Sequence, residues 1–202
     1  MKTDGYLCRS TSYFSVEYYD QIFENINYAG QVLAQLEFEQ CTFINCTFEG
    51  VRFPKTTFMD CVCQNCNFGL ADFKGTGLKN VTFEQCKITG VDFGQCQDFM
   101  LAFTFVGCNL RYSSFGPQKL KKTRFQDCDI QDANFLNVDL TQATFQNCNL
   151  DRSVFSRCVL KGADFSTAYS FVIDPEDNQL EKARFARDGL AGLLQKYRLQ
   201  IV

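Results

Sequence analysis

Three closely spaced cysteines are the first residues in this sequence whose types could do chemistry. Cys61, Cys63 and Cys66 lie in the segment CVCQNC, and closely spaced thiolates of this kind resemble metal ligands. The chain has 12 cysteines but no histidine. Zinc sites that mix cysteine with histidine, and catalytic dyads or triads built on histidine, are therefore excluded. A site made of cysteines alone depends on which way these side chains point.

Carboxylates are the second candidate group. Residues 125–151 contain five acids and no base, and they directly follow residues 111–124, which contain five bases and no acid. The acids are Asp127, Asp129, Asp132, Asp139 and Asp151, and the bases are Arg111, Lys119, Lys121, Lys122 and Arg124. The first fifty residues are also acidic, with seven acids and two bases. These groups can be ordinary solvated surface, or they can attract a partner of opposite charge.

Nothing in the sequence gathers these groups into an active site. The chain has no glycine-rich phosphate loop and no Ser–His pair, and carboxylates that stay solvated keep ordinary acidity. We therefore expect no enzyme, no cofactor and no metal site. The net charge of -3 also argues against a nucleic-acid-binding protein that works through a broad basic surface.

The composition indicates one domain with an unusual core. The 202 residues are 46% hydrophobic and include 22 phenylalanines, but no tryptophan and only three prolines. Asp4 and Arg9 interrupt any apolar signal segment, and no apolar run approaches the roughly 18 residues of a membrane span. We expect a cytoplasmic protein with reduced cysteines. An excess of one aromatic residue is a reason to look for repeats.

A five-residue repeat runs through most of the chain. Every fifth residue from 38 to 93 is Phe except Cys63, Leu78 and Ile88, and from 110 to 165 Phe alternates with Leu or Ile. Two residues before each of these positions stands a small or slim residue, with Leu36 and Gln118 as the exceptions. The unit is thus a small, a polar and a large residue followed by two others.

A period of five excludes a continuous helix and a flat strand. Five residues turn an α-helix by about 500°, so the apolar stripe would drift around the axis. In a strand, an odd spacing puts successive large residues on opposite faces. The chain must instead bend about once per unit and coil into a solenoid. Four units per turn stack like residues, which predicts one column of Phe115, Phe135 and Phe155 and another of Phe125, Phe145 and Phe165.

Segments such as CTFINCTFEG and CNFGLADF resemble the pentapeptide-repeat proteins, whose consensus is A(D/N)Lxx. The resemblance covers about residues 28–165. It implies an all-β solenoid, a right-handed quadrilateral β-helix in which the large residue and the small residue two before it point inward. Cys61 and Cys66 stand at small positions and Cys63 at a large one, so we expect all three to serve as small hydrophobic core residues.

The repeat register breaks once and fades at both ends. Seventeen residues separate Phe93 from Leu110, so residues 94–107 must contain a bulge or small loop, which is either a local adjustment or a recognition loop. Residues 1–20 do not hold the register and suggest only an N-terminal cover. Residues 166–187 are expected to form a final irregular coil with a turn at residues 173–176. We expect a single domain over residues 1–202.

The period changes again in residues 188–202. Asp188 can cap a helix, and residues 199–202 can follow as a short strand. Leu190, Leu193, Leu194 and Tyr197 share one face of that helix. A solenoid needs a cap over its open end. The resemblance implies a second role, because similar tails join two rods tail to tail, so we expect a homodimer through these four residues.

The length, the nearly unbroken rod and the closing segment resemble the gyrase-protecting members of the family, such as the albicidin-resistance protein AlbG. That resemblance implies a DNA mimic that binds DNA gyrase or a related type II topoisomerase and protects it from drugs or toxins. The five aspartates between residues 125 and 151 are its candidate contacts. Qnr-type quinolone-resistance proteins carry larger loops than the two-residue insertion available here. The alternative is a non-catalytic interaction scaffold with a different protein partner, which the fold alone does not distinguish.

Overall fold

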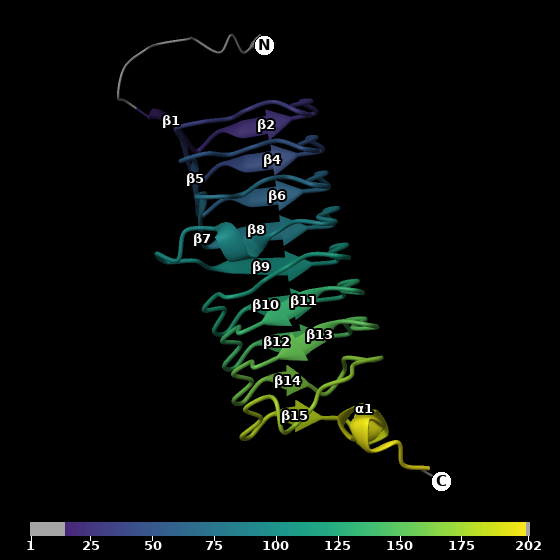
Figure 1. The fold of residues 1–202 in the computed structure, drawn as a ribbon. Helices are drawn as coiled ribbons and strands as arrows, with labels where there is room; N and C mark the ends of the chain where they lie inside the picture. The colour runs from purple at the N-terminus through teal and green to yellow at the C-terminus, as the bar shows by residue number, and fades with distance from the viewer. Residues whose placement is uncertain (1–14, 201–202) are drawn as a thin grey trace.

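The computed structural model describes residues 15–200, which form a parallel β-solenoid of about eight turns with one short helix at its C-terminal end (Figure 1). Each turn has four sides, and one turn usually takes twenty residues, as in the pairing of Phe23 with Phe43 and of Phe125 with Phe145. The two ends of the described chain lie at opposite ends of the rod. The predicted quadrilateral β-helix is thus confirmed.

Two of the four sides contain most of the strands, and we name the sides A to D in the order in which the chain meets them. Side A contains β1 (Val16–Tyr19), β3 (Leu36–Glu39), β5 (Thr57–Met59) and β7 (Gly77–Lys79). Side B is a nine-stranded sheet that runs the length of the rod. Its strands are β2 (Ile22–Glu24), β4 (Thr42–Ile44), β6 (Val62–Gln64), β8 (Val81–Glu84), β9 (Phe103–Val106), β10 (Arg124–Gln126), β12 (Thr144–Gln146), β14 (Asp164–Phe165) and β15 (Arg184–Phe185).

The other sides are built mainly from single parallel bridges. Side C is a ladder that passes from Asn27 through Asn109 to Tyr169. Side D passes from Val32 to Asp72 and again from Asp92 onward, and it includes β11 (Asn134–Leu136), β13 (Val154–Ser156) and the 3-10 turn η1 (Phe93–Gln95). Below β7, side A continues as the ladder Lys119, Asp139, Val159 and Gln179.

The chain bends because the second residue after most large residues adopts a left-handed conformation. Asp20, Asn25 and Gly30, for example, have φ values of 51°, 57° and 68°. This region favours glycine, asparagine and aspartate, which explains why those residues recur at the corners. Each corner turns the chain by one side, so the small and large residues of every unit return to the interior.

The core consists of columns of stacked rings. In one column the ring centroids of Phe115 and Phe135 are 4.8 Å apart, and those of Phe135 and Phe155 are 4.6 Å apart. Rings in neighbouring columns meet edge to face, such as Phe135 with Phe145, whose planes form an angle of 84°. Both arrangements are favourable for aromatic pairs. The predicted columns are confirmed, including the column of Phe125, Phe145 and Phe165.

The cysteines lie in the same core. All eleven cysteines within residues 15–200 are buried and free of disulfides, and Cys8 lies outside the described residues. The Cys61 thiol donates to the carbonyl oxygens of Phe38 and Met59 at 3.4 and 3.3 Å. Cys63 replaces a phenylalanine at a large position and is 1% exposed. The predicted core role of the three CVCQNC cysteines is therefore confirmed, and no group that could hold a metal ion occurs among the described residues.

The register begins earlier than the sequence pattern suggested. Val16, Glu17 and Tyr18 are a small, polar and large triplet that pairs residue by residue with Leu36, Glu37 and Phe38. The prediction that residues 1–20 do not hold the register was therefore wrong for residues 16–20. The N-terminal cover predicted for the preceding residues lies outside the described part of the chain.

The interruption within residues 94–107 occupies only residues 97–102. Cys96 is still buried at a small position, and β9 already pairs with β8, with Phe105 opposite Phe83. The backbone N–H groups of Gln97 and Ala102 donate to side A of the preceding turn, at the carbonyls of Thr76 and Leu78. The residues between them therefore project from side A, where the next strand after β7 would have been.

The C-terminal segment differs from the prediction in two respects. The helical part is a series of short pieces, η2 (Arg187–Gly189), α1 (Ala191–Leu194) and η3 (Gln195–Tyr197). Asp188 lies inside the first piece and Ala186 precedes it, so the predicted cap at Asp188 was wrong. Residues 198–200 form no strand, and residues 201–202 are outside the described chain. Within residues 15–200, no helix has the length and apolar character that a membrane crossing needs.

Candidate partner-binding surfaces

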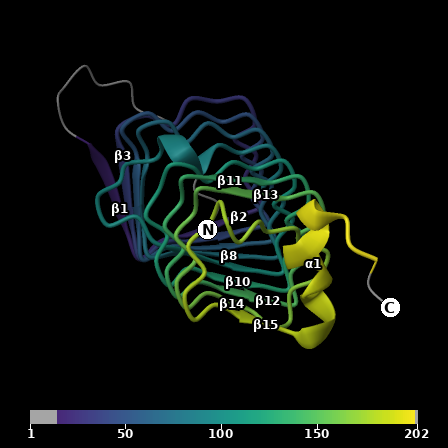
Figure 2. The same ribbon diagram turned by 60° about the horizontal axis from the view of Figure 1, so that its bottom comes forward.

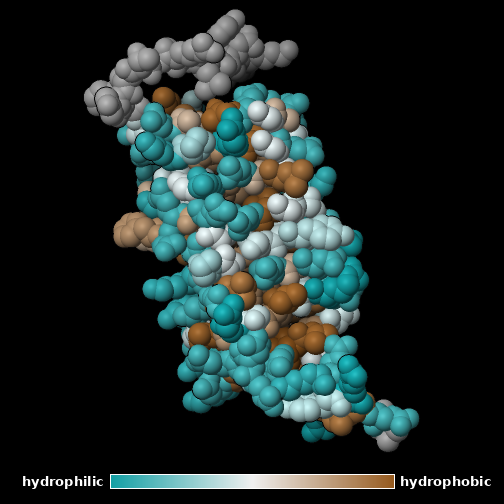
Figure 3. All heavy atoms as spheres, in the orientation of Figure 1, coloured by the Kyte–Doolittle hydropathy of each residue, from teal (hydrophilic) through white to brown (hydrophobic). Residues whose placement is uncertain are grey.

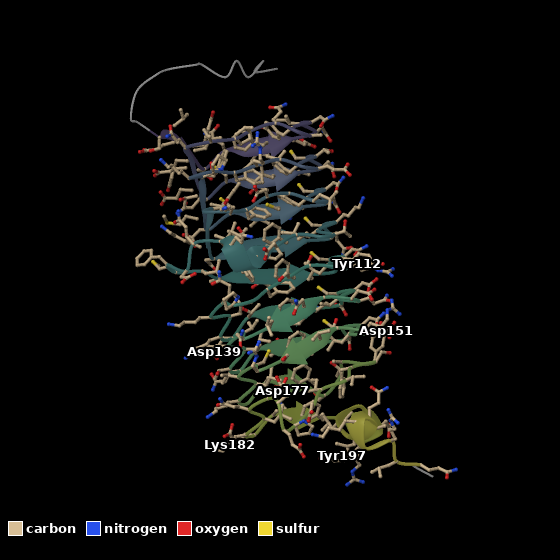
Figure 4. The ribbon with its side chains drawn as sticks, in the orientation of Figure 1. Tyr112, Asp139, Asp151, Asp177, Lys182 and Tyr197 are labelled. Atoms are coloured by element: carbon tan, nitrogen blue, oxygen red, sulfur yellow. The ribbon has the colours of Figure 1, made fainter. Side chains whose placement is uncertain are left out.

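The five candidate aspartates do not form one surface. Asp129 belongs to the ladder of side C, whereas Asp139 belongs to the ladder of side A. Asp127 and Asp132 occupy corners with φ values of 54° and 56°. Figure 4 shows Asp139 at one edge of the rod and Asp151 at the opposite edge. A partner that contacts all five would have to surround the rod.

Four of these aspartates are paired with bases in a neighbouring turn or beside them. Arg111 approaches Asp129 at 3.9 Å, and Lys121 approaches Asp139 at 3.3 Å. Arg152 contacts both Asp132 and Asp151, at 2.7 and 2.5 Å. Three of the four pairs join residues 18 or 20 positions apart, which is about one turn. Arg111 and Lys121 of the basic block therefore compensate two aspartates of the acidic block in the next turn, and Arg152, which follows the acidic block, compensates two more.

Hydrogen bonds favour the charged form of two of the aspartates, Asp132 and Asp127. The hydrogen bond from Arg152 lowers the pKa of Asp132 below its usual value. Hydrogen bonds from Asn147, at 3.0 Å, and from Gln126, at 2.9 Å, lower the pKa of Asp127. Asp127 differs from the other four in forming no salt bridge with a base of the described residues.

A second group of acids lies near the N-terminal end of side A, and we call it the N-terminal acidic surface. It consists of Glu17, Asp20, Glu37 and Glu39, all of which are exposed. Glu17 and Glu37 are paired neighbours in β1 and β3. No lysine or arginine of residues 15–200 forms a salt bridge with any of the four. Their negative charge is therefore less compensated than that of the five aspartates.

The projecting loop of residues 97–102 displays two large apolar side chains. Phe99 and Met100 are 69% and 65% exposed, although the residues on either side of the loop, Cys96 and Phe103, are buried. The Lys79 ammonium lies 5.5 Å from the centre of the Phe99 ring. Figure 3 shows an apolar protrusion on an otherwise largely polar edge of the rod. Two adjacent exposed apolar side chains on a projecting loop are a candidate contact site for another protein.

Sequence reasoning left the role of this loop open and did not single out Phe99 or Met100. The signal was present, because the two-residue insertion coincides with adjacent large apolar residues that the repeat unit does not require. Their exposure could not be predicted, since it depends on Gln97 and Ala102 both reaching back to the preceding turn.

The four residues predicted to join two copies divide into two groups. Leu193 packs against the core and is half-buried. Leu190, Leu194 and Tyr197 are 45%, 36% and 49% exposed. Next to them lies an open groove of about 560 Å³, whose lining includes Phe171, Val172, Leu194, Arg198 and Leu199. The C-terminal segment therefore both covers part of the core and presents an apolar surface.

The fold and these surfaces define the class: residues 15–200 form a β-helical rod with a packed interior, which offers its outer faces and ends for contact with other molecules. The family model described as pentapeptide repeat region matches residues 36–99 and 99–155, which is more than half of the chain. The protein belongs to the pentapeptide repeat family.

Two solved structures extend the similarity over nearly the whole chain. Full-length QnrB1, a plasmid-mediated fluoroquinolone resistance protein, has a TM-score of 0.58 and 15% sequence identity, and the alignment covers 91% of this chain and 100% of QnrB1. A trypsin-treated QnrB1 variant gives a TM-score of 0.57 and 14% identity, with coverage of 94% and 100%. These identities support a shared fold. No curated protein matches the sequence of this chain.

Proposed function

We propose that this protein binds DNA gyrase or a related type II topoisomerase in the cytoplasm and protects it from a poison or toxin. The observation that carries the proposal is the similarity to QnrB1, which extends from one end of that protein to the other. Pentapeptide repeat proteins are generally structural or interaction proteins without catalysis. Protection would therefore come from occupying a surface of the enzyme.

We infer that acidic side chains make the first contact, by imitating the phosphates of DNA. The N-terminal acidic surface is better suited to this than the five aspartates, because no base within the described chain forms a salt bridge with it. Successive turns of a β-helix lie about 4.8 Å apart, so stacked carboxylates such as Glu17 and Glu37 form a closely spaced row of charge. A DNA-binding surface is rich in lysine and arginine and would attract such a row.

The projecting loop, and those of the five aspartates that a partner can reach from side A, complete the proposed contact. Asp127, Asp129, Asp132, Asp139 and Asp151 add negative charge, but breaking the salt bridges that all of them except Asp127 form with bases of the rod costs free energy. Phe99 and Met100 lie on side A, the same side as Glu17 and Glu37. In that position they can fill an apolar pocket of the enzyme and contribute affinity that charge alone does not supply.

The experiment is capture of purified gyrase subunits by the tagged protein, together with protection of cells from a gyrase poison. Three charge variants are compared: Glu17, Glu37 and Glu39 to Gln; the five aspartates to Asn; and Lys119, Lys121 and Lys122 to Asn as the matched control. We expect the first set to lose about tenfold in binding, corresponding to roughly 1.4 kcal/mol. The aspartate set should lose less, because four of its five charges are already paired with bases, and the lysine set should lose least.

Binding and protection should fall together in these variants, and also in Phe99→Ala combined with Met100→Ala. If the wild-type protein neither captures gyrase nor protects against any poison tested, the proposal fails and the alternative of an interaction scaffold with another partner stands. If protection survives all substitutions, the contact lies on another part of the rod.

We propose further that two copies join through the C-terminal segment. Leu190, Leu194 and Tyr197 are exposed beside the apolar groove, and burying them against a second copy would remove that surface from water. Leu194→Asp should give a folded monomer by light scattering. Leu70→Asp, at a side chain that is 70% exposed on a corner far along the chain, is the control and should leave the dimer intact. A wild-type monomer would leave the segment with only its capping role.

A further inference from the structure

The outer face of side A carries opposite charge on its two halves. Before the projecting loop of residues 97–102, this face and its corner with side B contain one base, Lys79, and five exposed acids, which are Glu17, Asp20, Glu37, Glu39 and Asp60. After the loop, the same face and corner contain two acids, Asp139 and Glu181, and five exposed lysines, which are Lys119, Lys121, Lys122, Lys161 and Lys182. Side A is thus acidic toward the N-terminal end and basic toward the C-terminal end.

The lysines of the basic half are only partly neutralised within the rod. Lys121 pairs with Asp139 at 3.3 Å. Lys161 pairs with Glu181 at 3.6 Å. The lysines of this half that form no salt bridge within residues 15–200 are Lys119, Lys122 and Lys182. Both halves of side A therefore keep charge that an outside partner can pair.

The loop divides side A in the middle. Four strands of side A precede it, and four positions of the side A ladder follow it, from Lys119 to Gln179. In Figure 1 the loop projects from the edge of the rod formed by β1, β5 and β7, and Figure 4 shows Lys182 farther along that edge. The exposed Phe99 and Met100 therefore lie at the centre of side A, between the acidic and the basic half.

A face of this kind is complementary to itself in the antiparallel direction. A two-fold axis through the loop and perpendicular to the rod sets each turn before the loop opposite a turn after it in a second copy. At the corners, Asp20 of the first turn then faces Lys182 of the last. One turn further in, Glu39 faces Lys161. A parallel arrangement would set acids against acids and lysines against lysines, so the charges favour a second copy in one direction only.

The centre of such a pair is apolar. Phe99 and Met100 of the two copies meet at the axis and leave water together. Sheets packed face to face lie about 10 Å apart, a gap that these residues and the long lysine and glutamate side chains can fill. Lys79 would face Lys121, but each already has a partner in its own chain. These partners are the Phe99 ring, whose centre is 5.5 Å from the Lys79 ammonium, and Asp139.

The C-terminal helical segment leaves side A open. Figure 2 shows β1 and β3 on one side of the rod and α1 on the opposite side. Contact through side A and contact through the C-terminal segment therefore use separate surfaces.

We propose that side A is a self-association surface, and that its occupant is side A of a second copy in the antiparallel direction. The pair is closed, because both copies use the same surface. Exposed charge pairs contribute little individually and are screened by salt, so the pair forms at high protein concentration and low ionic strength and separates otherwise. While it lasts, it withholds the N-terminal acidic surface and the projecting loop from any other partner.

The position of the two-fold axis is tested with an engineered disulfide. Asp98→Cys places an exposed thiol in the loop, where two copies meet. Oxidised glutathione joins the two thiols and is itself reduced to two molecules of glutathione. At low salt we expect a disulfide-linked dimer of this variant. The parent chain and Gln146→Cys, at an exposed position on side B, should stay unlinked, since contact through the C-terminal segment does not bring two loops together.

The charge pairing is tested in Leu194→Asp, so that the C-terminal contact cannot supply the dimer. In sedimentation velocity this variant should be a monomer at about 500 mM salt and a dimer at about 20 mM. Asp20→Lys or Lys182→Glu alone should raise the dissociation constant at least about fivefold. The two together keep the net charge of the parent and should restore most of the affinity. Phe99→Ala combined with Met100→Ala should weaken the dimer without unfolding the rod.

If Leu194→Asp does not fold, the same substitutions are made in Asp98→Cys, and the yield of linked dimer replaces the dissociation constant. No linked dimer of Asp98→Cys at low salt would overturn the proposal. So would a dimer that is indifferent to both charge reversals and to the loop substitutions. No topoisomerase is present in these measurements, so their outcome is independent of the function proposed above.

Discussion

In this rod, the effect of a substitution depends on whether it falls at the buried large residue of a repeat unit. Phe135 is fully buried and stacks between Phe115 and Phe155, at 4.8 and 4.6 Å. Burying such a ring contributes roughly 1.5–3 kcal/mol. The residue that directly follows the large one points outward. Of these two adjacent positions, only the outward-facing one should tolerate a charged side chain. The register is thus a property that single substitutions can test.

Phe135→Asp should abolish soluble folding, because it places an unpaired carboxylate among stacked rings at a cost of several kcal/mol. Gln146→Asp, one residue past the large position of Phe145, should change the free energy of unfolding by less than about 0.5 kcal/mol, since Gln146 is exposed. Soluble yield and urea denaturation compare the two variants. Equal damage at both positions would contradict the assigned register.

The thiols should be nearly inert in the native protein. Burial raises the pKa of Cys61 to about 12, so at pH 8 its reactive thiolate is scarce, and the thiol becomes reactive only when the core opens. With a chromogenic disulfide at pH 8, we expect at most one of the 12 cysteines to react quickly and all to react after denaturation. Rapid labelling of most thiols before denaturation, or stoichiometric zinc in the purified protein, would show that the core assignment is wrong.

At the level of elements, the turn of about twenty residues is the unit that stacks, and close backbone contacts limit what it tolerates. Gly94 is such a contact, because a Cβ atom there would lie 1.8 Å from the Gly116 carbonyl oxygen of the next turn. Gly75 differs, since it adopts a φ of 69° but a Cβ atom there would have no atom beyond the adjacent residues within 4 Å. Gly94 is therefore required by close packing, whereas Gly75 is favoured only by the left-handed backbone conformation of its corner.

Gly94→Ala should therefore destabilise the rod by about 2 kcal/mol or more, since neighbouring backbone must move. Gly75→Asn should cost about 1 kcal/mol or less, because asparagine adopts the left-handed conformation readily. Urea denaturation of both variants measures the difference. If Gly75→Asn were as unstable as Gly94→Ala, the loss of stability at both sites would come from the backbone conformation and not from close contact.

The repeat could be found from the sequence because each unit carries its own small and large residue. The ends could not be described as well. Val16 and Tyr18 were missed because tyrosine takes the place of phenylalanine outside the strong tract, although they pair with Leu36 and Phe38. The start of the helical segment was misassigned because packing of Gly192 on Phe171 positions it, whereas the capping rule considers only local residues such as Asp188.

At the scale of the whole molecule, coiling rearranges charge that looks segregated in the sequence. The basic block and the acidic block are about one turn apart, so Lys121 lies beside Asp139 and Arg111 beside Asp129. A spacing of 18 to 20 residues was the available signal, and it could be interpreted only after the turn length was known. The acids of the first turns form no such pairs within the described chain, which is why the proposed contact shifts toward the N-terminal end.

The central claim is that this rod occupies the DNA-binding surface of a type II topoisomerase. The most direct test measures displacement of a fluorescent linear DNA from purified gyrase by the wild-type protein at 50 and 200 mM salt. We predict complete displacement at low salt, with an apparent affinity that falls several-fold at the higher concentration, since the attraction is between charged surfaces. Gyrase that keeps its DNA at saturating rod concentration would contradict the account.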